Sequence, residues 1–316
     1  MLKTVYVLGE LNVDLVASGQ DIMPEFNREK LLDTFELALG SSSAITACVL
    51  SALGLEVHFV SVSGNDEFGR FAVEQLKLKG VNTRYVHMDE RLNTGVTLSL
   101  SNKRDRALLT YMGSIPCLTP EHVPLQNIPE GAHVHFGSYY LQDGMRAHWE
   151  QLFAKLRQRG ITTSFDTGWD PRERWYREQI HGLLRYTDIF LPNEEEAKRI
   201  FEVEDVETAA AKLPRERGIV AIKRGSGGSL YVEPDGKVHM RRAYRVDPLD
   251  PTGAGDSFNA GFICGYLEGL RGTELLAFAN ACGALATLRV GGAGDIPSRD
   301  EVCEFMKNHP YAGENV

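Results

Sequence analysis

Residues Asp250–Phe262 read DPTGAGDSFNAGF, a glycine-rich turn that runs directly into a segment with helical spacing of apolar residues. A turn that opens a helix commonly forms an anion site, because the first N–H groups of a helix have no partners within it. The amides of residues 253–256 can therefore point at one anion, helped by the positive end of the helix dipole. The turn also carries a carboxylate, Asp256, which could be a helix cap, a metal ligand or a catalytic base.

Two familiar nucleotide-binding motifs do not fit this turn. A Walker A loop needs a Lys-Ser/Thr pair after its last glycine, where this chain has Asp256 and Ser257. A dinucleotide fingerprint needs a third glycine where Phe258 stands. The letters GAGD also occur at Gly292–Asp295, but Pro297 follows there and predicts a turn rather than a helix. GAGD alone is therefore a weak signal, and the longer string is the specific one.

Composition limits the class of protein. The chain has 316 residues, enough for one large α/β domain or two ordinary ones, and its 43% hydrophobic and 24% charged residues are typical of a globular protein. Its net charge of -9 argues against a large nucleic-acid surface. The five cysteines form no CxxC pair and predict reduced thiols rather than a disulfide or zinc framework. The first residues do not resemble a signal peptide, and no apolar run approaches the roughly 20 residues of a membrane span. We expect a cytoplasmic protein with no nucleic-acid or membrane partner.

Short apolar runs alternate with helical segments along most of the chain. Thr4–Gly9 predicts a buried strand, and Ser41–Gly54 predicts a serine-capped helix that a glycine ends. The alternation continues to about Leu288 and predicts a parallel sheet covered by helices on both faces. We therefore expect a three-layer α/β/α, Rossmann-like architecture in a single domain over residues 1–316.

Two stretches, Leu15–Leu39 and Gly95–Met112, instead alternate apolar and polar residues, which predicts strands with one open face. They interrupt the region where a parallel sheet places its ligand crevice. We interpret them as a small β-sheet lid over a substrate, formed by about residues 15–39 and 94–113, with a surface hairpin as the alternative. Exposed strand edges in such a lid favour a homodimer through it.

The longer string closely resembles the C-terminal signature of the ribokinase-type (phosphofructokinase-B-type) carbohydrate kinases. Leu39–Gly69, LGSSSAITACVLSALGLEVHFVSVSGNDEFG, is similar to the N-terminal signature of that family. The resemblance runs from GELNVD at Gly9–Asp14 to the final helices. It implies a ribokinase-like fold and an ATP- and Mg²⁺-dependent transferase that phosphorylates a hydroxyl of a small polyol, usually a sugar.

The resemblance also implies residue roles. Asp256 corresponds to the catalytic base, and Gly253, Ala254 and Gly255 correspond to the anion hole. Amides at a helix start would stabilise the transferred phosphoryl group while the carboxylate accepts the proton of the attacking hydroxyl. The positions that correspond to ATP contacts are Asn193, Lys223, Gly225, Gly228, Thr252, Asn280, Ala284 and Gly292.

Metal and substrate positions follow in the same way. Asn193 and Glu196 form the family's N-x-x-E pattern and would support Mg²⁺ largely through water, although the run of acids at 194–196 is also typical of an ordinary first helical turn. Asp250, with the loop at 292–298, could hold a monovalent cation such as K⁺. The expected substrate-binding residues are Asn12, Asp14, Gly40 and Ser41, together with Thr94 on the lid and Asp166 after a strand.

This sequence departs from the family pattern at three places. The N-terminal signature usually has two glycines and then an asparagine, where this chain has Gly40, Ser41 and Ile45. Ser41 can still offer a hydroxyl to substrate, whereas Ile45 removes an amide side chain. Pro251 stands where a threonine is common, which removes a hydroxyl and an N–H. Two alternatives therefore stay open, a nucleoside kinase on the same fold and a nucleotide- or sugar-binding regulator without activity.

Overall fold

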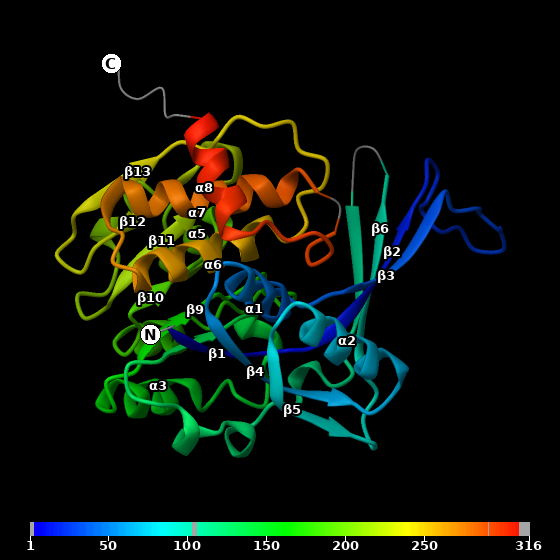
Figure 1. Cartoon of the computed structure of the whole chain (residues 1–316), viewed down its shortest axis with the longest axis horizontal. Helices are drawn as coiled ribbons and strands as arrows, with labels where there is room; N and C mark the ends of the chain where they lie inside the picture. The colour runs from blue at the N-terminus through cyan, green and yellow to red at the C-terminus, as the bar shows by residue number, and fades with distance from the viewer. Residues whose placement is uncertain (1–2, 103–105, 290, 310–316) are drawn as a thin grey trace.

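The alternating strands and helices build a large sheet in the computed structural model, which describes residues 3–102, 106–289 and 291–309 (Figure 1). Its strands are β1 (Thr4–Leu8), β4 (Glu56–Gly64), β5 (Asn82–Asp89), β8 (His133–Phe136), β9 (Thr162–Phe165), β10 (Ile189–Phe190), β11 (Ile219–Lys223), β12 (Ser229–Val232) and β13 (Val238–Arg241). Neighbouring strands follow the order β13-β12-β11-β10-β9-β8-β1-β4-β5. All pairs from β11 to β5 are parallel, and β12 and β13 are antiparallel additions at one edge.

Helices cover both faces of this sheet, which confirms the predicted three-layer α/β/α fold. One face carries α1 (Ser42–Ala52), α2 (Glu67–Leu78), α6 (Ala254–Leu267), α7 (Gly272–Thr287) and α8 (Arg299–Asn308). The other face carries α3 (Trp149–Gln158), α4 (Arg177–Leu184) and α5 (Glu194–Phe201). This layering follows from the connections, because a parallel pair of strands needs a long crossover, usually a helix.

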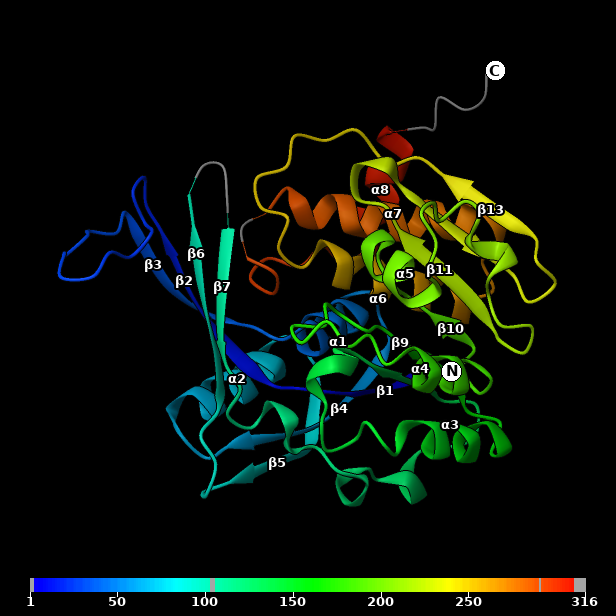
Figure 2. The same ribbon diagram turned by 180° about the vertical axis from the view of Figure 1, so that it is seen from behind.

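A second, four-stranded sheet projects from the main body, as Figures 1 and 2 both show. It consists of β2 (Asn12–Ser18), β3 (Thr34–Leu39), β6 (Gly95–Ser101) and β7 (Arg106–Tyr111), in the order β3-β2-β6-β7. These strands lie within or beside the two segments that the sequence predicts as a lid, and we call them the lid sheet. The strand β2 begins earlier than expected, at Asn12.

The register of the lid sheet separates two chemically different faces. Phe35, Ala17 and Leu100 are paired across three strands, and Leu37, Leu15, Leu98 and Leu109 are paired two residues further along. Because side chains alternate across a strand, both rows lie on one face, which is apolar. The opposite face carries Ala38, Asp14, Thr97 and Thr110. The lid sheet therefore has one apolar face and one mostly polar face.

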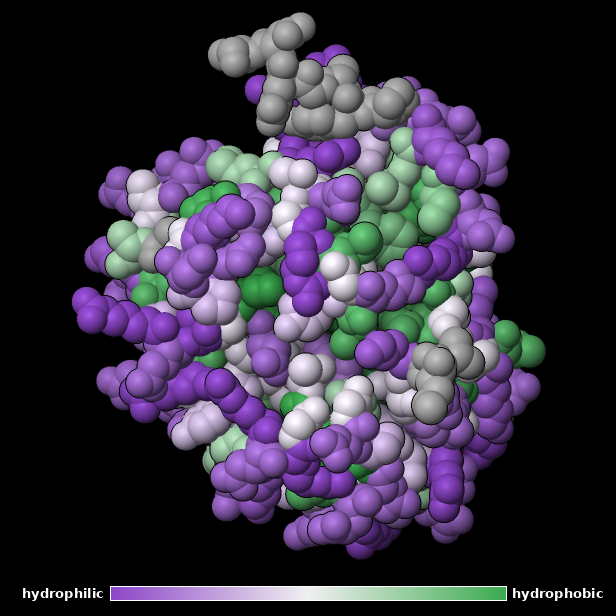
Figure 3. Space-filling model, turned by 60° about the vertical axis from the view of Figure 1, so that its left-hand side comes forward, coloured by the Kyte–Doolittle hydropathy of each residue, from purple (hydrophilic) through white to green (hydrophobic). Residues whose placement is uncertain are grey.

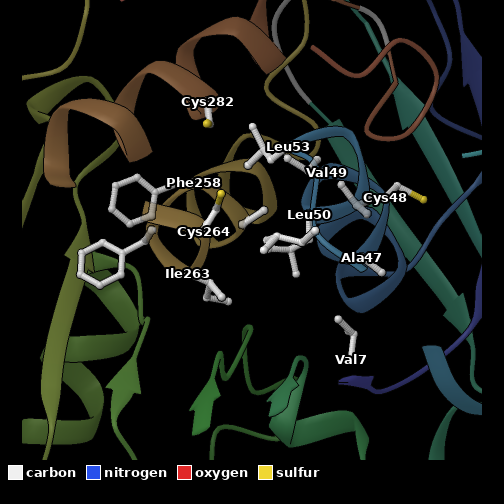
Figure 4. Close-up of a cluster of buried hydrophobic side chains, with 14 of the residues drawn as sticks. Val7, Ala47, Cys48, Val49, Leu50, Leu53, Phe258, Ile263, Cys264 and Cys282 are labelled. Carbon is white, nitrogen blue, oxygen red and sulfur yellow. The ribbon is translucent and has the colours of Figure 1, made fainter. Parts of the chain in front are cut away.

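A hydrophobic cluster joins α1 to α6 and fixes their first turns close together. Figure 4 shows Ala47, Val49 and Leu50 of α1 near Phe258 and Ile263 of α6. All five side chains are buried. Burial of a large apolar side chain contributes about 1.5–3 kcal/mol, so this contact is a strong constraint on the relative position of the two helices. Their N-terminal turns form part of the site described below.

Several elements were not predicted from the sequence, namely β5, β12, β13, α4 and α8. The edge strand β13 has only exposed and half-buried residues and thus lacks the apolar run of a central strand. The second GAGD segment lies in a non-helical loop between α7 and α8, as predicted. All five cysteines are free thiols, also as predicted.

Hydrophilic residues predominate on the face shown in Figure 3. Within the described residues, no helix combines the length and the apolar character needed to cross a bilayer. Large exposed apolar side chains instead gather on the lid sheet and the loop between β2 and β3: Met23, Phe26, Leu31, Leu32, Phe35, Leu108, Leu109 and Tyr111.

Candidate active site

The glycine turn leads into α6, as the sequence predicts, and its backbone requires glycine at one position. Gly253 has a φ of +74°, in the left-handed region, and a Cβ at this position would lie 2.8 Å from the Cα of Gly292. A side chain would therefore meet both conformational strain and a backbone clash. The carbonyl of Gly253 accepts the N–H of Ser257 at 2.8 Å, which begins the helix.

Three of the four amides predicted to form the anion hole are available for a ligand. The N–H of Ala254 donates to the carbonyl of Pro251 at 3.2 Å. The N–H groups of Gly253, Gly255 and Asp256 have no acceptor within the described part of the chain. Unpaired amides at a helix start attract anions, so the turn retains the predicted chemistry without Ala254.

Asp256 lies in the first turn of α6, where the hydroxyl of Ser42 donates a hydrogen bond to its Oδ1. Loss of hydration raises the pKa of this carboxyl to about 7, and the Ser42 hydroxyl opposes that rise. Asp166 and Glu10 add negative charge nearby, whereas Lys223 adds a positive charge. A carboxyl with a pKa near 7 is well matched to proton transfer at neutral pH.

Lys223, at the end of β11, forms a buried ion pair with Asp166, which follows β9. Its Nζ also donates to Oδ1 of Asn259 at 3.0 Å, and Asn259 donates from Nδ2 to Oδ2 of Asp166 at 2.7 Å. Burial alone would raise the pKa of Asp166, but the Lys223 ammonium holds it below its ordinary value. A Cβ on Gly255 would lie 3.9 Å from Nζ of Lys223, so a buried cation stands beside the anion-binding turn.

Asn193 and Glu196 come together at the start of α5, as the N-x-x-E spacing predicts. Their side chains form a reciprocal capping box: the N–H of Glu196 donates to Oδ1 of Asn193 at 2.9 Å, and the N–H of Asn193 donates to Oε2 of Glu196 at 2.9 Å. The hydroxyl of Thr167 also donates to Glu196 at 3.3 Å. Burial and then the charge of Asp166 raise the pKa of Glu196 to about 7.

Around Lys223 there are more acidic side chains than basic ones, and this excess of negative charge suits a divalent metal ion. Four carboxyl groups, from Glu10, Asp166, Glu196 and Asp256, interact electrostatically with one another or with Lys223. In the described residues, no group of three or more His, Cys, Asp or Glu side chains is arranged to ligate a metal directly. Mg²⁺ commonly takes one or two carboxylates, several waters and substrate phosphates, so the residues present fit Mg²⁺ rather than a metal that needs an all-protein site.

Asp250 connects the turn to the loop that follows α7. Its Oδ1 accepts the N–H of Thr252 at 2.9 Å and the Thr252 hydroxyl at 2.6 Å. Its Oδ2 accepts the N–H of Gly291 at 2.9 Å. The two segments expected to hold a monovalent cation are therefore adjacent.

The predicted substrate residues Asn12, Asp14 and Gly40 meet at the junction of the lid sheet and the main body. Nδ2 of Asn12 donates to Oδ1 of Asp14 at 3.2 Å and to the hydroxyl of Thr97 at 3.4 Å. A Cβ on Gly40 would lie 2.2 Å from Oδ1 of Asp14, so glycine at this position makes room for the carboxylate. These groups form a polar surface suited to the hydroxyls of a sugar.

Two predicted substrate residues are instead used within the protein. The hydroxyl of Ser41 donates to the Glu10 backbone carbonyl at 2.6 Å and accepts the N–H of Ala44 at 3.0 Å, so it caps α1. The hydroxyl and N–H of Thr94 donate to the two carboxylate oxygens of Asp66 at 2.6 and 2.7 Å. Both side chains are buried, and these bonds engage their hydroxyl groups within the protein.

A cavity of about 360 Å³ lies next to the glycine turn and contains most of the predicted ATP residues. Lys223, Gly225, Gly228, Asn280 and Ala284 line it. The remaining three predicted ATP residues do not line this wall: Thr252 and Gly292 lie beside the turn, and Asn193 caps the start of α5. The volume falls within the usual range for small-molecule sites.

Sequence reasoning missed part of this cavity wall and one buried acid. The wall also contains Tyr244, Val246, Pro248, Phe258 and Thr287. The segment from 243 to 248 has neither a strand nor a helix period, and only its apolar residues before the glycine turn could have indicated it. Glu10 directly follows a buried strand in the sequence, which is the position where parallel sheets place functional side chains, and that signal was available.

Comparison with known proteins shows which family the chain resembles over nearly its full length. The profile of the family described as pfkB family carbohydrate kinase matches residues 2–299. An ATP-dependent ribose-1-phosphate kinase from Halopiger xanaduensis is 30% identical over 300 residues, which cover 94% of this chain and 96% of that protein.

Solved structures give the same result. A provisionally named Ribokinase II from E. coli, in complex with ATP and Mg²⁺, superposes with a TM-score of 0.85 at 26% identity and covers 98% of this chain and 100% of its own. A fructokinase double mutant from Vibrio cholerae, bound to fructose, ADP and a potassium ion, shares the fold with a TM-score of 0.78 at 20% identity, over 96% of this chain and 98% of its own.

Proposed function

The chain belongs to the pfkB family of carbohydrate kinases, which makes it an ATP-dependent carbohydrate kinase, and on that premise we propose its catalytic residues and substrate class. It transfers the γ-phosphate of ATP to a hydroxyl of a small sugar or sugar derivative, and Asp256 is the general base. The observation that carries this proposal is the position of Asp256, with a pKa raised to about 7, at the start of a helix with unpaired amides beside the nucleotide-sized cavity.

The protein contributes positioning and charge rather than covalent chemistry. The amides of Gly253, Gly255 and Asp256 stabilise the phosphoryl oxygens as negative charge spreads over them. Asp256 takes the proton of the acceptor hydroxyl as its oxygen bonds to phosphorus. Lys223, next to the same turn, adds a positive charge in a site removed from water, where electrostatic interactions are strong.

Bound Mg²⁺ would neutralise charge on the phosphates of ATP. Asn193 and Glu196 would hold it, largely through water, and Asp166 lies in the same group of acids. A monovalent cation such as K⁺ would sit between the segment of Asp250 and the loop at 292–298. The fructokinase structure that holds a potassium ion shares the fold of this chain, and the likeness extends no further than the fold.

On the acceptor side, Asn12 and Asp14 bind sugar hydroxyls, and Gly40 leaves the space that they require. Asp14, Thr97 and Thr110 share the polar face of the lid sheet, which suits hydrogen bonding to a polyol. Closure of the lid sheet over the sugar would exclude water, so that phosphate is transferred to the sugar rather than to water.

The proposal is tested by coupled measurement of ADP release over neutral sugars, sugar acids, sugar phosphates and nucleosides. Turnover with a sugar or sugar derivative supports it, and turnover with nucleosides alone would indicate a nucleoside kinase. Nucleotide binding without turnover on any acceptor would indicate a regulator. Asp256→Asn should lower kcat by about 10²–10⁴ if the carboxylate is the base. A folded variant with near-normal kcat would remove that role from Asp256.

A further inference from the structure

Three consecutive serines begin α1, and their side chains divide between two acids. Both Ser41 and Ser43 are buried. Ser43 donates to the carboxylate of Glu10 at 2.8 Å, and Ser41 shares its one hydroxyl proton between the backbone carbonyl of Glu10 at 2.6 Å and its carboxylate at 3.0 Å. Ser42, between them, is partly exposed and donates to Oδ1 of Asp256. Ser41 is the N-cap of α1, with non-helical φ and ψ of 72° and 118°, so helical rotation does not relate its side chain to those of Ser42 and Ser43.

Glu10 holds this turn of α1 rigidly in place. Its carboxylate accepts hydrogen bonds from four side chains, including Ser138 at 3.0 Å and Gln142 at 3.1 Å, and it is 3% exposed. Hydrogen bonds to an ionised group are among the stronger ones in proteins, and a buried, fully paired carboxylate fixes the groups around it. Ser42 is therefore held from both sides by anchored neighbours.

The two helices are also fixed against each other. The first turn of α1 faces that of α6, and the hydroxyl of Thr46 donates to the backbone carbonyl of Asp256 at 3.5 Å. The hydrophobic cluster shown in Figure 4 also packs α1 against α6. The Ser42 hydroxyl thus reaches Asp256 from a frame that does not depend on bound ligands.

We propose that Ser42 is a positioning residue for the base: it holds Oδ1 of Asp256 and leaves Oδ2 to take the proton of the acceptor hydroxyl. This inference rests on the proposed function. Within the described residues, no side chain donates to Oδ2. During transfer the acceptor oxygen bonds to phosphorus, the bond from phosphorus to the ADP oxygen breaks, and the acceptor proton moves to Oδ2. Ser42 keeps its own proton throughout.

The charges that face Asp256 give this role a measurable signature. Lys223 from β11 favours the ionised carboxylate, and Asp166 after β9 and Glu10 after β1 disfavour it. The Ser42 hydroxyl acts in the same direction as Lys223. Removal of that hydroxyl should raise the pKa of Asp256 and move the acid limb of the rate profile to higher pH.

The experiment compares Ser42→Ala and Ser42→Thr with Ser51→Ala, a matched control near the far end of the same helix. For Ser42→Ala we expect the midpoint of kcat/KM against pH to rise by about one unit and kcat at pH 7 to fall about tenfold. Ser42→Thr, which keeps a hydroxyl, and Ser51→Ala should retain the wild-type midpoint. In the Asp256→Asn background, Ser42→Ala should have no further effect on the residual rate.

Two results for Ser42→Ala would overturn the inference and leave Ser42 with a structural role. One is a lower kcat with an unchanged midpoint of the pH profile. The other is an equal loss of kcat in the Asp256→Asn background. A second readout does not need an acceptor: the ¹³C carboxyl titration of Asp256, assigned by its absence in Asp256→Asn. If the wild type phosphorylates no acceptor, the proposed function fails, and this titration still decides whether Ser42 holds the carboxylate. An unshifted titration in Ser42→Ala would overturn that contact.

Discussion

Asp256 combines basicity near neutral pH with a burial that disfavours its ionised form. Its pKa of about 7 in the folded protein exceeds the ordinary value of about 3.9, so the folded state binds more protons between these values. Stability from this group is therefore lost as the pH rises from about 4 to about 7. We predict that Asp256→Asn raises the free energy of unfolding by about 1–3 kcal/mol at pH 8 and changes it little at pH 4.

Urea unfolding of the two proteins at both pH values checks this prediction. Asparagine keeps the size of the side chain and can still accept a hydrogen bond from Ser42, so the comparison isolates the charge. An equal change at pH 4 and pH 8 would show that the substitution acts through packing and not through ionisation.

The second prediction concerns Lys223, whose positive charge should contribute both to the free energy of unfolding and to the rate of phosphate transfer. Lys223→Met would leave Asp166 buried without its cation, so we expect a loss of about 3–5 kcal/mol in unfolding free energy. We also expect kcat to fall about 10²–10³-fold, since the charge beside the anion-binding turn is gone. Thermal or urea unfolding and steady-state kinetics measure the two effects.

The double variant Asp166→Asn with Lys223→Met separates these effects. It removes both charges of the buried pair, so most of the stability should return while kcat stays low. Recovery of kcat together with stability would show that Lys223 acts only as a structural partner of Asp166.

At the scale of elements, the turn that begins α6 depends on the backbone of Gly253. Gly253→Ala adds a Cβ in a left-handed conformation and 2.8 Å from Gly292, which should move the turn and its amides. We predict that it destabilises the protein by more than about 2 kcal/mol and lowers kcat at least tenfold. Gly236 has a φ of +92°, and a Cβ there would meet no atom within 4 Å, so it is the matched control.

Gly236→Ala should cost only about 1–2 kcal/mol of conformational strain and leave kcat unchanged. Unfolding curves and kinetics of the two variants provide the comparison. Equal destabilisation by both, with normal kcat in Gly253→Ala, would mean that the close approach to Gly292 is relieved by the loop and that the turn tolerates a side chain.

Sequence patterns correctly predicted the elements whose capping residues, glycines and apolar spacing are used in the folded protein as these patterns suggest. The serine-capped helix at 42–52 and the turn before α6 fall in this class, as does the N-x-x-E pair at the start of α5. Ser41 and Thr94 show the limit: each is a small polar residue near the cleft, but which group its hydroxyl meets depends on residues far along the chain, Glu10 and Asp66. Such pairings have no periodic signature.

At the scale of the whole molecule, the site assembles segments that are distant in sequence. Six segments contribute side chains to it: the loop after β1, the first turn of α1, the loop after β9, the start of α5, the end of β11 and the start of α6. These segments lie at the carboxyl ends of parallel strands or at helix starts, where α/β sheets place their ligands. The alternation of strands and helices in the sequence predicted that the site lies at this edge of the sheet. Which side chains meet there could be seen only in the folded structure.

The lid sheet leads to the last prediction, on the assembly of the protein. Its apolar face exposes Phe35, Leu109 and Tyr111 by 61%, 60% and 57%, and such a surface is rarely left uncovered in a monomer. We therefore propose a homodimer in which two lid sheets pack through these faces.

Phe35→Glu with Leu109→Glu should convert a dimer of twice the chain mass into a monomer in sedimentation velocity. The same double variant should raise the KM for the sugar, because the lid loses its support. Leu249→Glu, which places the same charge at a residue 71% exposed on the main body, should remain dimeric. A wild-type protein that sediments as a monomer at micromolar concentration, or a double variant that remains dimeric, would contradict this arrangement.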